Sequence, residues 1–288
     1  MDKVGIEAVK CIGLVTDFGD SPYTGIIRSL AHSITGDSSC IVDIDHSVPS
    51  FSTLAGAYVV AHTYRWLPRG SVVATVVDPG VGSTRDPVAV EAGDYYFIGP
   101  NNGVLYPAIA REGFKQGVRL SPQRVARLAE PRFLGKLPRG KWPLSNTFHG
   151  RDVFVPAAAL VALGHRLEEL GEPLELKDLA RASIDYVERS NSGYRATVVY
   201  VDKFGNAALS AREHSIPLKL GEPVIVETMS GVSYRIPFLR TFSDVNPGDL
   251  VMYVNSFGHL EIAVNQGSAA RKLGLEIGEK ITIHVASL

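Results

Sequence analysis

An aspartate, an arginine and a histidine in this chain could together handle a water molecule. Asp78 ends the apolar run "SVVATVVD", and Arg85 follows after a loop of Pro, Gly, Ser and Thr. His149 lies in "TFHGRD". A guanidinium keeps a neighbouring carboxylate ionised, and a neutral imidazole can polarise or deprotonate water. The set suits metal-free hydrolysis or displacement, although a loop salt bridge and a histidine at a helix end would use the same residues.

Polar residues also follow other apolar runs in the first half of the chain. In open α/β sheets, ligands bind at the carboxyl edge of the strands, so residues gathered there indicate a polar pocket. Each one alone could equally start a turn or cap a helix. The residues at these strand ends are Asp17, Asp45 with His46, Asp78, and Asn101 with Asn102.

The order of predicted elements divides the chain near Ala182. Strand and helix patterns alternate in 1–182, which predicts an α/β domain with a mixed, mostly parallel sheet and flanking helices. Short β-type runs separated by turns fill 183–288 and predict a barrel-like all-β domain. Expected strands of the first part cover 11–17, 40–46, 71–78, 87–93 and 94–100, and expected helices cover 25–34, 53–67 and 101–112. Expected strands of the second part cover 194–202, 206–211, 222–228, 232–238, 250–256, 259–265 and 280–287.

The composition argues against several classes of function. A formal net charge of -1 provides no general electrostatic basis for binding nucleic acid or an anionic membrane. No apolar run approaches the roughly 20 residues that span a bilayer, and the first residues lack a signal pattern, so we expect a cytoplasmic protein. Cys11 and Cys40 are too few for a zinc quartet. They could form one disulfide, but in a reducing cytosol we expect two buried thiols.

Two further segments carry expectations about local structure. Residues 114–141 hold eight basic residues and one acidic residue, which is typical of a solvated, partly irregular connector. An anion-binding edge or a subunit contact is the alternative. An apolar helix is expected to begin near Val153, with Asp152 as its N-cap.

Two turns in the second half combine polar and aromatic side chains. In "VDKFGN", Asp202 ends a strand and Phe204 lies in the turn, where its ring could stack on a flat ligand such as a purine. "NSFG" repeats this pattern with Ser256. These turns indicate that a small amphipathic ligand binds to the β domain.

Seven ordered motifs lie between Val15 and Ala269: "VTDFG", "DIDHSV", "VVDPGVGSTR", "YFIGPNNGVL", "TFHGRD", "VDKFGN" and "NSFGHLEIAVNQGSA". Together they resemble one family, the SAM hydroxide adenosyltransferases. These are S-adenosyl-L-methionine (SAM) hydrolases that form adenosine and are related to SAM-dependent fluorinases and chlorinases.

The resemblance implies hydrolysis of SAM to adenosine and L-methionine by attack of water or hydroxide on ribose C5′, without cofactor or metal. It implies an α/β domain plus a β-barrel, and a homotrimer whose active sites lie between subunits. The hydrolase branch carries an Asp–Arg–His set, which falls here on Asp78, Arg85 and His149. Halogenating relatives lack this Asp and His, have Ser at the position of Gly150, and carry a loop that is absent between Arg85 and Pro100. A halogenase, or a SAM or adenosine sensor with negligible turnover, remains the alternative.

The resemblance also implies contacts with the substrate. Asp17 would bind the ribose hydroxyls, Asp202 the methionine ammonium, and Ser256 the methionine carboxylate. The loop after Asp17, which contains Ser21 and Tyr23, is one residue shorter than is usual in the family. The aromatic and amide contacts would be Phe51 at the ribose, in place of a Trp, and Phe204, Asn206 and Phe242 at the adenine, with Gln266 standing where relatives have Ala.

Overall fold

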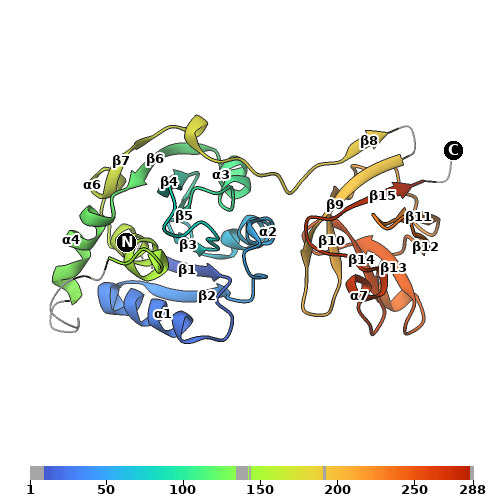
Figure 1. Cartoon of the computed structure of the whole chain (residues 1–288), viewed down its shortest axis with the longest axis horizontal. Coiled ribbons are helices and arrows are strands. Elements are labelled where there is room, and N and C mark those ends of the chain that lie inside the picture. Colours follow the sequence, from blue (N-terminus) through green and yellow to red (C-terminus); the bar gives the residue numbers. More distant parts are fainter. Residues whose placement is uncertain (1–9, 134–141, 143, 191–192, 286–288) are drawn as a thin grey trace, which may run out of the picture. The chain divides into compact units, whose positions relative to one another are not determined.

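The computed structural model describes residues 10–133, 142, 144–190 and 193–285 of the 288. The chain forms two compact units, 1–182 and 183–288, each with its own sheet (Figure 1). Within the described residues, no helix combines the length and apolar character needed to cross a bilayer.

The first unit is built on a mixed sheet with the strand order β2-β1-β3-β5-β4-β6-β7. Strands β2, β1, β3 and β5 are parallel neighbours, so their carboxyl ends share one edge, whereas β4, β6 and β7 pair antiparallel. The chain runs from β1 outward to β2 and then returns to β3 on the other side of β1, so the strand order reverses between β1 and β3. In a doubly wound sheet, ligands bind at this reversal. The strands are β1 (Cys11–Thr16), β2 (Cys40–Asp45), β3 (Val72–Val76), β4 (Pro87–Ala92), β5 (Tyr95–Pro100), β6 (Phe114–Leu120) and β7 (Gly171–Leu174).

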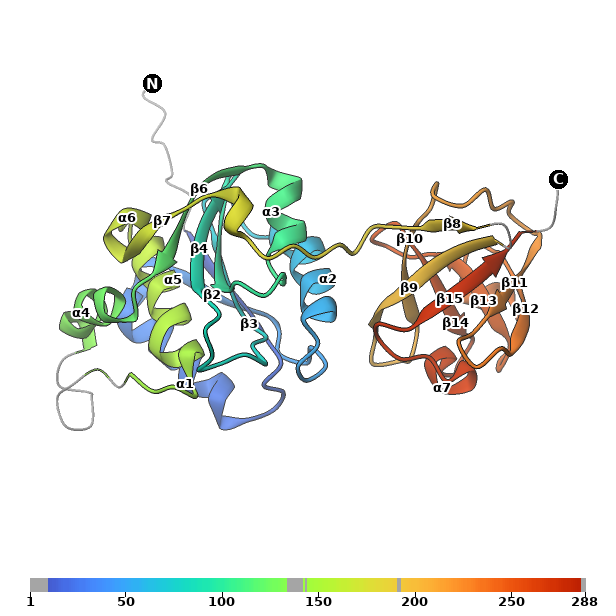
Figure 2. The same cartoon turned by 45° about the horizontal axis from the view of Figure 1, so that its top comes forward.

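Helices cover both faces of this sheet. Figure 2 shows α1, α4 and α5 on one face and α2 and α3 on the other. Helix α1 buries Ile27, Leu30, Ala31 and Ile34, whose spacing places them on one stripe facing the sheet. The helices are α1 (Pro22–Thr35), α2 (Thr53–Thr63), α3 (Tyr106–Glu112), α4 (Pro122–Phe133), α5 (Val155–Ala162) and α6 (Leu167–Leu170), with short turns η1 (Gly36–Ser38), η2 (Tyr64–Trp66), η4 (Gly150–Phe154) and η5 (Leu176–Asp178).

The second unit is a nearly closed β-barrel, as the short β-type runs predict. Its strand order is β12-β11-β15-β9-β10-β14-β13, and a bridge between Phe238 and Met252 links the chain after β12 to β13. Val198, Leu209 and Ile262 belong to its buried core. The elements are β8 (Glu188–Ser190), β9 (Gly193–Val201), β10 (Ala207–Arg212), β11 (Pro223–Glu227), β12 (Ser233–Pro237), η6 (Phe242–Asp244), β13 (Leu250–Val254), β14 (His259–Val264), α7 (Ala269–Leu273) and β15 (Lys280–His284).

The two cysteines form a disulfide, so the expectation of free thiols is wrong. Cys11 and Cys40 are register partners at the start of the parallel pair β1 and β2, and their Cα atoms are 4.5 Å apart. This spacing falls within the range that a disulfide spans. Strand register, which the sequence does not show, brings the two sulfur atoms together.

The basic segment is also more regular than expected. Residues 114–120 form β6 inside the sheet, between β4 and β7. Residues 122–133 form α4, which buries Val125, Ala126 and Ala129 and turns its basic residues outward. The interpretation as an irregular connector is therefore wrong for 114–133, and the remainder, 134–141, lies outside the described residues.

Candidate active site

Asp78, Arg85 and His149 meet in one hydrogen-bonded group. Arg85 Nε donates to Asp78 Oδ1 at 2.8 Å, and Arg85 Nη2 donates to Asp78 Oδ2. The same Nη2 lies 2.7 Å from His149 Nδ1. The side chains of Arg85 and Asp78 are only 9% and 5% exposed, so the pair is shielded from water. The spatial grouping that the sequence leaves open is therefore present in the fold.

The glycines of the loop allow this close packing. Gly82 has a φ of +78°, and a Cβ there would lie 2.5 Å from the backbone oxygen of Asn146. A Cβ on Gly80 would come within 3.3 Å of Arg85 Cγ. The 78–85 loop therefore lies directly against the segment that leads to His149, and a larger residue at 82 would push the two apart.

His149 is placed by an irregular turn that the sequence does not predict. It precedes the π-helical turn η4, which continues into α5. The ring of Phe154 lies beneath the guanidinium, 5.1 Å from Arg85 Cζ. Asp152 is fully buried inside η4 and accepts from the backbone N–H of Ser145 at 2.8 Å. It does not cap α5, so the predicted N-cap is wrong. Instead, Asp152 ties the turn to the segment before it.

The geometry determines which histidine nitrogen carries the proton. A guanidinium nitrogen can only donate, so His149 Nδ1 accepts from Arg85 and a neutral ring carries its hydrogen on Nε2. Burial lowers the pKa of His149 below its ordinary value of 6.5, and the charge of Arg85 lowers it further, against the opposing charges of Asp78 and Asp152. Arg85 Nη1 is buried and has no hydrogen-bond partner among the described residues. The group thus offers unused N–H donors in a shielded place.

Asp17 follows β1, next to the strand that leads to Asp78. Its Oδ2 accepts from the backbone N–H of Phe51 at 2.9 Å, while no partner for Oδ1 occurs within the described part of the chain. Phe51 is 72% exposed and has a φ of +66°. A bulky residue in this conformation is strained, and such strain is concentrated at functional sites. The pair presents a carboxylate oxygen beside an exposed ring.

The other polar strand ends have mainly structural partners. Asn101 Nδ2 donates to the backbone oxygen of Asp178 at 3.0 Å, and Asn102 Nδ2 donates to that of Val77 at 2.9 Å. Asp45 Oδ1 accepts from the backbone N–H of Ser47 at 2.6 Å. For these residues, the alternative of turn and loop formation accounts for what is seen.

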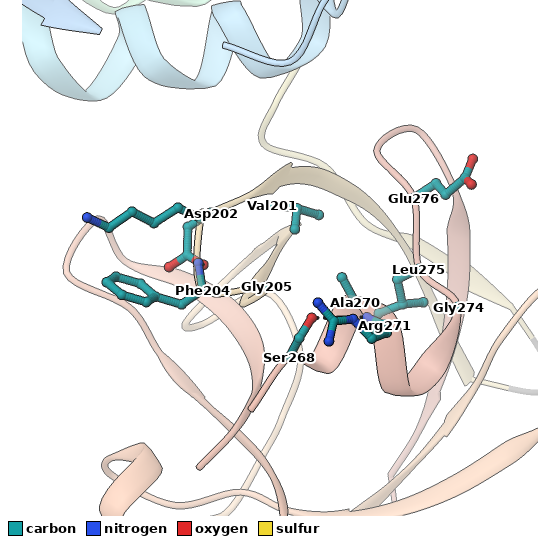
Figure 3. Close-up of a pocket in the computed structure, with 11 residues that line it drawn as sticks. Val201, Asp202, Phe204, Gly205, Ser268, Ala270, Arg271, Gly274, Leu275 and Glu276 are labelled. Carbon is teal, nitrogen blue, oxygen red and sulfur yellow. Dashed lines mark hydrogen bonds between the residues drawn. The ribbon is translucent and has the colours of Figure 1, made fainter. Parts of the chain in front are cut away.

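The turn between β9 and β10 holds Asp202, Phe204 and Asn206 together. Asp202 Oδ1 accepts from the backbone N–H groups of Phe204 and Asn206, both at 2.9 Å, and Oδ2 accepts from Asn206 Nδ2 at 2.9 Å. Phe204 is 65% exposed. The turn borders an open pocket of about 400 Å³, and Figure 3 shows its remaining wall, made of Ser268, Ala270, Arg271, Gly274, Leu275 and Glu276.

The remaining predicted contacts lie on other turns of the barrel. Phe242 is 50% exposed, and its ring lies 6.3 Å from that of Tyr253. Ser256 lies in the turn between β13 and β14, which Asn255 closes by accepting from the N–H groups of Phe257 and His259. Gln266 has a φ of +55°; it and Phe51 are the non-glycine residues with positive φ in the described ranges.

An aromatic cluster near His149 was not predicted. The ring centroids of Phe18, Tyr23 and Phe148 are 5.1–5.9 Å apart. A Cβ on Gly150 would lie 3.4 Å from both Phe18 and Phe148 and 3.1 Å from Val76 Cγ1. The two phenylalanines stand directly beside Asp17 and His149 in the sequence, but only the fold shows that the rings meet.

The described residues contain no group of three or more His, Cys, Asp or Glu side chains arranged to hold a metal ion. The Asp78 carboxylate and the His149 imidazole are hydrogen-bonded to Arg85.

The chain is similar in sequence to known proteins over nearly its whole length. Family models described as the SAM hydroxide adenosyltransferase N-terminal and C-terminal domains match residues 12–171 and 196–282. A protein named (R)-S-adenosyl-L-methionine hydrolase from Thermus thermophilus is 37% identical, covering 96% of this chain and 100% of that relative. One of the same name from Salinispora tropica is also 37% identical, covering 94% and 97%. A fluorinase from Actinopolyspora mzabensis is 25% identical, covering 93% of each chain.

Solved structures agree with this relationship. A crystal structure of an uncharacterized conserved protein from Thermotoga maritima aligns with a TM-score of 0.81 and 28% identity, covering 94% of this chain and 99% of that one. A conserved hypothetical protein from Thermus thermophilus aligns with a TM-score of 0.73 and 31% identity, covering 95% and 99%. The chain belongs to the SAM hydroxide adenosyltransferase family.

Proposed function

We propose that this protein hydrolyses S-adenosyl-L-methionine to adenosine and L-methionine. The observation that carries the proposal is the buried group of Asp78, Arg85 and His149, in which Arg85 Nη1 has no partner among the described residues. The relatives named SAM hydrolase, at 37% identity, support the same reaction.

The reaction is one in-line displacement at C5′ of the ribose. A bond forms between the attacking oxygen and C5′ while the bond from C5′ to sulfur breaks, and its electron pair stays on sulfur. Methionine therefore leaves as a neutral thioether and needs no general acid. The water that supplies the attacking oxygen gives up one of its two protons to solvent, and the other stays on the 5′ hydroxyl of adenosine. Catalysis then depends on holding a desolvated nucleophile in line, which is a matter of orientation and electrostatics.

The free donors favour hydroxide as the nucleophile. Arg85 Nη1–H and His149 Nε2–H would both donate to the attacking oxygen. Water has two lone pairs, so two donors would leave none for attack. Hydroxide keeps a third lone pair, and a guanidinium stabilises its charge. Asp78 would hold Arg85 in place through two hydrogen bonds. In this arrangement His149 orients the nucleophile and is not its base.

Both units would contribute to binding the substrate. Asp17 would accept hydrogen bonds from the ribose hydroxyls, with Phe51 against the sugar. Asp202 already accepts three N–H groups, but a carboxylate has about four acceptor positions, so it could also receive the methionine ammonium. Ser256 would contact the methionine carboxylate. The adenine would lie among Phe204, Asn206 and Phe242, two of which are exposed rings.

We further propose that the chain acts as a homotrimer in the cytoplasm, without cofactor or metal, with active sites at subunit interfaces. Light scattering after size exclusion tests the trimer. Disulfides are uncommon in the cytoplasm outside hyperthermophiles. Reduced Cys11 and Cys40 in cell extracts would therefore support this location, and a disulfide between them there would argue against it.

Chromatography of SAM incubated with purified protein tests the function. The expected products are adenosine and methionine in equal amounts. Parallel incubations with chloride and fluoride test the halogenase alternative, which would yield 5′-halo-adenosine. Tight binding by calorimetry without products over hours would instead indicate a sensor.

A further inference from the structure

A second hydrogen-bonded chain of side chains lies beside Asp17. Thr16 Oγ1 is 2.8 Å from His46 Nδ1, and His46 Nε2 is 3.0 Å from Asp43 Oδ1. Arg28 donates to both oxygens of Asp43, with Nε at 3.2 Å from Oδ1. Thr16 is fully buried at the end of β1, and the His46 side chain is 13% exposed. The order Thr–His–Asp is that of a catalytic triad, but a threonine without solvent access cannot attack a substrate.

The hydrogen positions among these side chains follow from the N–H of Phe18 at one end and the Asp43 carboxylate, which only accepts, at the other. The N–H of Phe18 donates to Thr16 Oγ1 at 3.2 Å, so this oxygen already acts as an acceptor. The Thr16 hydroxyl hydrogen then has His46 Nδ1 as its acceptor, and no other occurs within the described residues. His46 therefore carries its own hydrogen on Nε2 and donates it to Asp43. With this arrangement of hydrogens, the Thr16 hydroxyl, the Nε2–H of His46 and the Nε–H of Arg28 each have an acceptor.

These bonds join the two loops that flank the predicted ribose site. The bond from Phe18 N–H to Thr16 spans Asp17 and holds its backbone in a bend. The N–H of Gly19 donates to the backbone oxygen of His46 at 2.7 Å, so His46 holds this loop through its main chain as well. The N–H of Phe51, in the loop after β2, then reaches the Asp17 carboxylate.

We propose that His46, held between Thr16 and Asp43, is a positioning residue that sets the Asp17 carboxylate for the ribose hydroxyls. The inference rests on the proposed function, because it assumes that Asp17 binds ribose. His46 does not touch the substrate in this account. It fixes the loop after β2 against the loop after β1, and so fixes the angle at which the carboxylate meets the sugar.

The test compares kcat/KM for SAM with kcat/KM for its 2′-deoxy analogue. In the wild type, loss of one hydrogen bond to a carboxylate should lower kcat/KM by about tenfold to hundredfold. Thr16→Val removes the buried hydroxyl without changing the shape. We expect it to reduce the discrimination between the two substrates by about threefold or more, as do mutations within one hydrogen-bond network. His46→Phe should have the same effect, and His46→Gln, which keeps one acceptor and one donor, should retain more of the discrimination.

The matched control is Thr75→Val. Thr75 is fully buried in the neighbouring strand β3, and its hydroxyl has no partner among the described residues. This variant makes the same chemical change without altering the hydrogen bonds among Thr16, His46 and Asp43. It should discriminate between SAM and the 2′-deoxy analogue as the wild type does. Thermal unfolding of each variant identifies those that fail to fold.

Asp17→Ala separates the inference from the function on which it rests. If Asp17→Ala still discriminates like the wild type, then Asp17 does not bind the ribose and that part of the proposed function is wrong. If Asp17→Ala loses discrimination while Thr16→Val and His46→Phe keep it, the positioning role is overturned. Equal loss in Thr75→Val would also overturn it, because the effect would then reflect packing.

Discussion

Arg85 Nη2 lies 2.7 Å from Nδ1 of His149, and this contact defines the chemistry that the imidazole can perform. The arginine supplies the hydrogen, so Nδ1 is occupied as an acceptor and Nε2 bears the ring hydrogen of a neutral histidine. A base would need a free lone pair facing the substrate water. The imidazole instead presents a donor, and the same arginine presents a second one.

His149 is therefore expected to be neutral at pH 7, with its hydrogen on Nε2. Burial and the charge of Arg85 lower its pKa below 6.5. Arg85→Met removes the positive charge and should raise the pKa of His149. Nitrogen NMR of the labelled imidazole reads both the tautomer and the pKa. A hydrogen on Nδ1, or a pKa above 6.5 in the wild type, would contradict the hydroxide mechanism.

The same shift predicts how His149 affects stability. Because its folded-state pKa lies below the unfolded value, the unfolded chain binds a proton first as pH falls through 6.5. The contribution of His149 to the free energy of unfolding should therefore fall below pH 6.5 and level off beneath the folded-state pKa. His149→Asn should lack this component in urea titrations at a series of pH values.

Asp78→Asn and His149→Ala should reduce kcat far more than they change KM. His149→Ala removes one positioned donor, and Asp78→Asn loosens the hold on Arg85, which supplies the other. Loss of one positioned donor typically lowers kcat by about 10²–10³-fold. Asp86→Asn is the matched control, because Asp86 lies just after Arg85 but makes a partly exposed ion pair with Arg119. Such ion pairs contribute only about 0–1 kcal/mol to the free energy of unfolding. Because Asp86 lies outside the group of Asp78, Arg85 and His149, turnover should be unchanged. Wild-type turnover in both test variants would remove the proposed roles.

Gly82→Ala should separate the loop that carries Asp78 from the segment that leads to His149. The new Cβ would lie 2.5 Å from the backbone oxygen of Asn146, in a backbone conformation with positive φ. Gly113→Ala is the control: its φ is +86°, but nothing lies within 4 Å of the new Cβ. The strain of alanine at positive φ should lower the free energy of unfolding by more than about 1 kcal/mol in both variants. Only Gly82→Ala should also lose kcat, and equal kcat in the two would argue against the close approach.

Removal of the disulfide should lower stability without affecting catalysis. Cys11 and Cys40 are 29 residues apart, and a crosslink of that length stabilises by about 3–4 kcal/mol through the unfolded state. The bridge joins the starts of β1 and β2, whereas Asp17 follows the other end of β1. The double variant Cys11→Ala, Cys40→Ala should unfold at lower urea concentration with unchanged kcat/KM. Unchanged stability would argue against the bridge.

Much of the fold could be predicted because the spacing of apolar residues and the positions of turn-forming residues indicate the same elements. The apolar runs that end in Asp17 and Asp78 are parallel strands, and the seven β-type runs after Ala182 are strands of the barrel. The basic segment was wrongly predicted to be a partly irregular connector because charged residues dominate its composition. Its apolar residues Val125, Ala126 and Ala129 still form the buried stripe of α4.

Features that depend on tertiary contacts could not be predicted. Strand register unites Cys11 with Cys40, and nothing in their local sequence indicates this. The positive φ of Phe51 has no signal such as glycine. Asn101 looked like a pocket residue, but its partner Asp178 is far along the chain. The meeting of His149 with Arg85 follows from how the fold packs two distant loops together.

The central claim is that oxygen from solvent becomes bonded to ribose C5′. Incubation of SAM with the protein in ¹⁸O-labelled water, followed by mass spectrometry of both products, tests it most directly. The account predicts one ¹⁸O atom at the 5′ position of adenosine and none in methionine, with about 10²–10³-fold less of this product from Asp78→Asn over the same time. Unlabelled adenosine, or label in methionine, would contradict attack by hydroxide at C5′.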